Sequence, residues 1–72
     1  MGQEEHVCRQ SARSCSVGDW IRLKDQPGAI FVVEAMTQLD PPDNVEVRRV
    51  RGDASFEAGD VPGGESVELV VI

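Results

Sequence analysis

The fold is predicted by one stretch, VGDWIRLKDQPGAIFVVEAM, which runs from Val17 to Met36. It holds two apolar runs: Gly18-Asp19 opens the first, and Pro27-Gly28 precedes the second. Such runs, bounded by turn-forming residues, are typical of β-strands that pair as a hairpin. The stretch therefore predicts a strand, a tight turn and a second strand at the start of a small β-domain.

The first predicted strand, about Trp20 to Lys24, alternates in character from residue to residue. Because successive side chains of a strand point to opposite faces, Ile21 and Leu23 are expected in the core. The opposite face would then carry Trp20, Arg22 and Lys24.

The second predicted strand, about Ala29 to Met36, is almost continuously apolar from Ile30 to Val33. A strand of this kind needs cover on both faces. We expect it to be the central strand, or else to use its outer face as an interface. Glu34 interrupts the run, and a carboxylate there is expected to face water or pair with Arg22, Arg48 or Arg49.

The remainder of the chain predicts three further strands. Leu39 to Asn44 contains two consecutive prolines, which lack backbone donors, and is expected to be a loop. A break in the alternation at Arg49-Val50 predicts a β-bulge. The expected strands are Val45–Val50, a short one near Ser55–Glu57, and Val67–Ile72, with Ala58–Gly64 as a turn.

Five short strands with turn residues at these spacings predict an all-β protein, a small antiparallel barrel of the SH3-like kind over residues 17–72. An OB-like barrel is the main alternative, but it needs a longer chain and a helix between its third and fourth strands. Residues 1–16 show neither alternation nor an apolar face and are expected to form a flexible N-terminal arm.

The length of 72 residues and the net charge of −6 limit the function. A chain this short buries only about 60% of its unfolded surface, which disfavours a deep catalytic cleft and favours a homo-oligomer.

The acidic balance disfavours non-specific nucleic-acid binding. All seven basic residues lie at or before Arg51, so a folded domain could present one basic and one acidic side. We expect a solvated charged surface that keeps the small protein soluble. With no apolar span and no leader-like segment, a cytoplasmic protein is expected, without membrane contact.

The residues Val17 to Lys24, with Pro27-Gly28 and the apolar run Ile30 to Val33, resemble the opening of YodC-like small bacterial proteins. They are similar, more loosely, to KOW and Tudor-type SH3-like modules. The resemblance covers this hairpin only and implies an SH3-like fold in a small bacterial protein. It does not imply one function, because this fold carries out many tasks.

A weaker likeness is to type II dihydrofolate reductases, short SH3-like chains that form a tetramer around a shared pore. The hairpin start and the segment Gly64 to Val70 resemble that family. However, Glu68 and Val70 stand where the family has the Gln and Tyr that line its pore. A ring of glutamates would repel anionic folate and cofactor, so this enzyme activity is disfavoured.

No catalytic motif, cofactor-binding loop or metal-site spacing is evident, so neither an autonomous enzyme nor a cofactor is expected. His6, Cys8 and Cys15 are the only soft metal ligands, one fewer than a closed zinc site needs. We expect no metal and reduced thiols.

The predicted binding patch is an aromatic residue ringed by cations: Trp20, Arg22, Lys24 and Arg48. Such a patch can anchor an acidic peptide or stack a base beside a phosphate. Alternatively, Trp20 packs under the arm or at a subunit contact. The exposed apolar edge near Ile30 and Val32 is the expected interface.

The leading functional prediction is a binding or assembly module that engages a protein partner or itself through this Trp20 face. A nucleic-acid-associated module of the KOW or Tudor type is the first alternative. An oligomeric pore-type enzyme is the second, and it predicts a symmetric tetramer.

Overall fold

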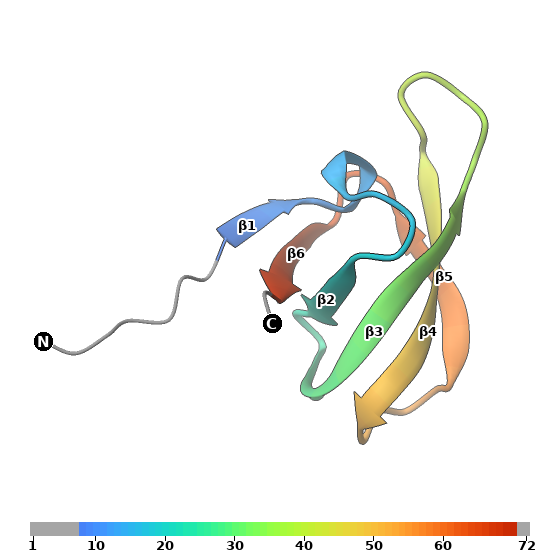
Figure 1. Ribbon diagram of the computed structural model, residues 1–72. Coiled ribbons are helices and arrows are strands. Elements are labelled where there is room, and N and C mark those ends of the chain that lie inside the picture. Colours follow the sequence, from blue (N-terminus) through green and yellow to red (C-terminus); the bar gives the residue numbers. More distant parts are fainter. Residues whose placement is uncertain (1–7, 71–72) are drawn as a thin grey trace, which may run out of the picture.

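Six β-strands and one short 3₁₀ helix make up residues 8–70, the part of the chain that the computed structural model describes. All six strands belong to one antiparallel sheet with the order β1-β6-β2-β3-β4-β5 (Figure 1). The sheet is not closed, because β1 and β5 are its two edges. Residues 8–70 include no helix that is long and apolar enough to cross a membrane. The elements in chain order are β1 (Cys8–Ser11), η1 (Ala12–Ser14), β2 (Trp20–Leu23), β3 (Gln26–Met36), β4 (Asn44–Gly52), β5 (Ala58–Pro62) and β6 (Ser66–Val70).

The all-β class and the antiparallel pairing are therefore confirmed, whereas the predicted five strands are six. Side chains from β2 through β6 form one buried cluster, so these five strands share a single core. Ile21 and Leu23 belong to it, as predicted, with exposed fractions of 0% and 6%. The fully buried ring of Phe31 stacks on the ring of Phe56, which packs against the cluster, with the two centroids 5.2 Å apart.

Strand β3 is the central strand that its apolar run predicts, since it pairs with β2 on one side and β4 on the other. Phe31 and Val33 point into the core and are fully buried. Ile30 and Val32 are half-buried on the opposite face. The prediction that they lie at an exposed edge is wrong, because β3 has a neighbour on each side.

The bulge predicted at Arg49-Val50 is confirmed by the pairing of β3 with β4. Phe31 pairs with Arg49 and Ile30 pairs with Arg51, so Val50 is the extra residue. Val50 is left 42% exposed. An extra residue in one strand reverses the side-chain alternation that follows it. The bulge therefore determines which face of the sheet Arg51 reaches.

Residues 8–16, the described part of the predicted arm, differ from the prediction. Strand β1 pairs with β6 along its whole length, from Cys8↔Leu69 to Ser11↔Ser66. The backbone then continues into η1, where the N–H of Ala12 donates to the carbonyl of Glu65 at 2.8 Å. Ala12 and Cys15 are buried, with exposed fractions of 0% and 5%. This segment gains from β6 the backbone partners that an isolated short segment lacks.

The fourth predicted strand is misplaced by a few residues. The structure has β5 at Ala58–Pro62, where a turn is predicted, and a loop at residues 53–57. Phe56 is a loop residue whose ring packs on Phe31 and beside Gly59. Pro62 is tolerated because β5 is an edge strand, where one missing backbone donor is not critical. The predicted Leu39–Asn44 loop is confirmed up to Asp43, and Asn44 begins β4.

Candidate functional site

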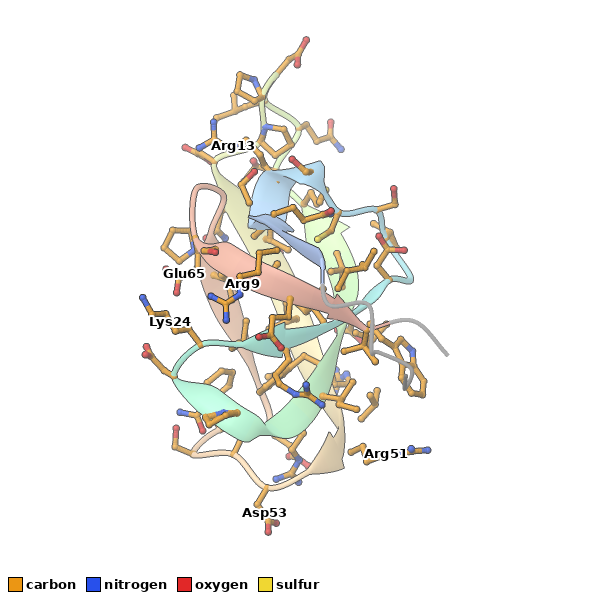
Figure 2. The ribbon with its side chains drawn as sticks, turned by 90° about the vertical axis from the view of Figure 1, so that its left-hand side faces the viewer. Arg9, Arg13, Lys24, Arg51, Asp53 and Glu65 are labelled. Atoms are coloured by element: carbon orange, nitrogen blue, oxygen red, sulfur yellow. The ribbon has the colours of Figure 1, made fainter. Side chains whose placement is uncertain are left out.

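Trp20 lies on the outer face of the sheet, half-buried between strands β3 and β6. Its backbone partners there are Val32 and Val70, both also half-buried. The guanidinium carbon of Arg51 lies 5.7 Å from the centroid of the indole ring. A cation at that distance is attracted by the negative face of the ring, with about 0.5–1 kcal/mol at exposed sites. Figure 2 shows Arg51 at the lower right of the sheet.

We define the Trp20 face as Trp20 and Arg51 with the apolar side chains of Ile30, Val32 and Val70. Ile30 is included because it pairs with Arg51 across β3 and β4. The structure thus brings the predicted aromatic residue and the predicted interface residues Ile30 and Val32 onto one surface. It also supplies a cation, Arg51, that the predicted patch does not include.

Arg48, a member of the predicted patch, is engaged elsewhere. Its Nε donates to a carboxylate oxygen of Glu34 at 2.8 Å, and both side chains are exposed. This hydrogen bond and the charge of Glu34 raise the pKa of Arg48 further above its ordinary value. The expected cross-strand ion pair of Glu34 is therefore confirmed, with Arg48 as the partner. Among the described residues, Arg51 and not Arg48 provides the cation beside Trp20.

Arg22 and Lys24, the other two predicted patch residues, line a separate hollow of about 240 Å³ together with Arg9. We call this hollow the basic pocket. Arg22 and Arg9 each bond to one carboxylate oxygen of Glu68, at 3.4 Å and 3.2 Å. Figure 2 shows Arg9 and Lys24 on the left side of the sheet, away from Arg51. The predicted single patch is therefore two sites.

A second hollow, of about 190 Å³, has the opposite charge. Leu23 lines it as well as the basic pocket, so the two hollows are neighbours. The acidic side chains that line the second hollow are Asp25, Asp60 and Glu65.

Sequence reasoning missed Arg51 and Arg9. For Arg51 a signal was present in the sequence, namely the bulge predicted at Arg49-Val50. The extra residue reverses the side-chain alternation after it, which places Arg51 opposite Ile30 on the outer face. For Arg9 no local signal exists, because its position depends on the pairing of β1 with β6.

Residues 8–70 contain no group of three or more His, Cys, Asp or Glu side chains that could hold a metal ion. His6 lies outside the described residues. Cys15 is a free, buried thiol, and Gln10 donates a hydrogen bond to its sulfur at 3.4 Å. Burial raises the pKa of the Cys15 thiol above its ordinary value, and the charge of Asp19 adds to this.

Cys15 is accordingly expected to be unreactive in the folded protein. In a Cys8→Ser variant, where Cys15 is the single thiol, alkylation by iodoacetamide at pH 8 should be at least about tenfold slower than in the urea-unfolded chain, because burial blocks access and disfavours the thiolate. The reaction is followed by mass spectrometry. Equal rates in the folded and unfolded chains would contradict the buried placement.

Comparison with protein families, curated proteins and solved structures found no match to this chain. Function must therefore be inferred from the Trp20 face and the basic pocket themselves.

Proposed function

We propose that this chain is a small cytoplasmic binding module of the SH3-like type, which binds an acidic, apolar segment of a protein partner at the Trp20 face. The proposal rests on one observation: a half-buried tryptophan on the outer face with the Arg51 guanidinium 5.7 Å from its ring centroid. The SH3-like assignment is supported by the return of β6 to pair with β2, which bends strands β2 to β6 around one core.

The composition of the face favours a protein partner. Tryptophan and arginine are the residue types most enriched among those that dominate the energy of protein interfaces. Ile30, Val32 and Val70 surround Trp20 with partly exposed apolar surface, which a partner would remove from water. The face therefore combines an aromatic anchor, an apolar surround and a cation.

The charge on the face favours an acidic partner. Arg51 forms no ion pair with the acidic side chains in residues 8–70, so its donors are open to a carboxylate. A carboxylate bonded to Arg51 would place a neighbouring apolar side chain beside the indole. The net charge of −6 opposes a nucleic acid, whose binding depends on many cations.

A displayed random-peptide library, selected on the immobilised full chain, tests the proposal. We expect enrichment of peptides with Asp or Glu next to apolar residues. Because truncation of a central interface tryptophan costs 2 kcal/mol or more, Trp20→Ala should weaken a selected peptide by about thirtyfold. Arg51→Gln should weaken it less. Trp20 is the only tryptophan and the chain has no tyrosine, so peptide binding can be measured by its fluorescence in the wild type.

Arg48→Gln is the matched control for Arg51→Gln. It removes the same charge from the same sheet, but Arg48 is ion-paired with Glu34. Circular dichroism establishes that each variant is folded. Peptides that bind Trp20→Ala as tightly as the wild type would exclude the Trp20 face. A tryptophan emission that shifts only with protein concentration would show a second copy as the occupant. Oligonucleotide binding with a steep salt dependence would favour the nucleic-acid alternative.

A further inference from the structure

The basic pocket is a second site, distinct from the Trp20 face, and we propose that it binds a phosphate monoester group. Three of its charged side chains come from strands that are distant in sequence: Arg9 from β1, Arg22 from β2 and Glu68 from β6. The strand order places Glu68 between the other two, paired with Arg9 on one side and Arg22 on the other. Three adjacent strands thus present one row of charged groups.

Each guanidinium in this row uses only part of its hydrogen-bonding capacity. Arg9 donates to Glu68 through Nη2, and Arg22 donates through Nη1. An arginine side chain carries five N–H donors in a planar fork, which suits the oxygens of a phosphate. Among the contacts of residues 8–70, both side chains retain donors for a further acceptor.

The Nε atom of Arg22 is the second observation. It is buried and has no hydrogen-bond partner among residues 8–70. Buried polar atoms in folded proteins almost always have a partner, and an exception calls for an explanation such as an absent ligand. An oxyanion in the pocket that Arg22 lines would supply an acceptor for this side chain.

The charge of the pocket selects the class of anion. Arg9, Arg22 and Lys24 bring three positive charges and Glu68 brings one negative charge, which leaves a balance of 3 − 1 = +2. Lys24 forms no ion pair with the described acidic residues. A phosphate monoester carries about −1.5 to −2 at pH 7 and compensates this balance. A phosphodiester or a carboxylate, with one negative charge, leaves it half compensated.

The size of the pocket agrees with a small group. Its volume of about 240 Å³ lies below the range of drug-sized ligand sites, which begins at about 300 Å³. Leu23, Pro27 and Val67 form its apolar lining. This lining would contact the carbon next to the ester oxygen, so an ester should bind more tightly than inorganic phosphate.

The binding test uses the ¹⁵N-labelled full chain and follows the Nε–H signal of Arg22 by NMR. The probes are methyl phosphate, inorganic phosphate, dimethyl phosphate and acetate, compared at constant ionic strength. We expect methyl phosphate to shift this signal and to saturate at the lowest concentration, because the dianion gives Arg22 an acceptor. Inorganic phosphate should follow, and dimethyl phosphate and acetate should bind at least about fivefold more weakly, since they carry one charge fewer.

Two variants with opposite expected effects test the site. Lys24→Gln should weaken methyl phosphate binding by at least about fivefold, because it removes a charge-assisted contact. Glu68→Gln should strengthen it by about the same factor, because it removes the carboxylate that competes for both arginines. Arg48→Gln and Glu34→Gln make the same two charge changes at an exposed pair outside the pocket and should leave the affinity unchanged.

The proposal is overturned if methyl phosphate leaves the Arg22 signal unmoved, or if acetate or dimethyl phosphate binds as tightly as methyl phosphate. It is also overturned if Arg48→Gln weakens binding as much as Lys24→Gln, since the attraction would then be a general field of the protein. Trp20 fluorescence reports the peptide site separately, so failure at either site can be told from failure at the other.

Discussion

Replacing Phe31 with alanine is expected to lower the free energy of unfolding by about 3–5 kcal/mol. Phe31 is fully buried on the central strand, and its ring stacks on that of Phe56 at 5.2 Å. The substitution removes apolar contacts and leaves a cavity in the core that strands β2 to β6 share. Small domains have total stabilities toward the low end of about 5–15 kcal/mol. The variant should therefore be largely unfolded at 37 °C.

Urea denaturation followed by circular dichroism measures this loss. Val32→Ala is the matched control, because it lies on the same strand but is half-buried on the opposite face. It should cost about 1 kcal/mol, since fewer contacts are lost. Similar losses for the two variants would mean that the core does not lie on the Phe31 side of β3.

Gly52→Ala is expected to destabilise the protein by about 2–5 kcal/mol, from a strained backbone conformation and from overpacking. Gly52 ends β4 with a φ of +82°, which L-residues with a side chain rarely adopt. An added methyl group would overlap the carbonyl oxygen of Gly28 and lie 2.9 Å from the Cα of Ala29. Both obstacles are backbone atoms of β3, so relief requires the two strands to separate.

Gly18→Ala separates the two contributions. Gly18 also has a positive φ, of +100°, but an added methyl group would meet no atom within 4 Å. This control should cost about 1–2 kcal/mol, the conformational term alone. The urea midpoints of both variants give the difference. If Gly18→Ala costs as much as Gly52→Ala, the close approach of β3 and β4 at this point is not a constraint.

The hairpin and the centre of the sheet could be predicted from sequence because their signals are local. The alternation at Ile21 and Leu23 and the apolar run from Ile30 to Val33 each depend on a few consecutive residues. The bulge at Val50 was visible for the same reason, as a break in a short alternating pattern. These features require no knowledge of which strands become neighbours.

The strands at the two edges of the sheet could not be predicted in the same way. The four residues of β1 carry no apolar alternation, and its contact between Arg9 and Glu68 joins positions 59 residues apart. Strand β5 contains Gly59 and Pro62, which favour turns over strands by local propensity. In both cases pairing with a neighbouring strand outweighs the local preference.

The candidate site was predicted only in part, because some of its residues depend on local sequence and others on which strands become neighbours. The alternation of one strand is enough to place Trp20 on the outer face. The cation beside it depends on the register of β3 with β4, which gives Arg51 in place of Arg48. The pairing of Arg22 with Glu68 requires the return of β6 to β2.

The position of β6 between β1 and β2 has a consequence for synthesis of the protein. Before residue 66 has been synthesised, β6 does not exist. The pairings of β1 with β6 and of β2 with β6 therefore cannot form. Strand β1 therefore lacks its pairing partner until β6 has left the ribosome. Folding of residues 8–16 is thus coupled to the arrival of β6, and the row of charged groups in the basic pocket is completed in that last step.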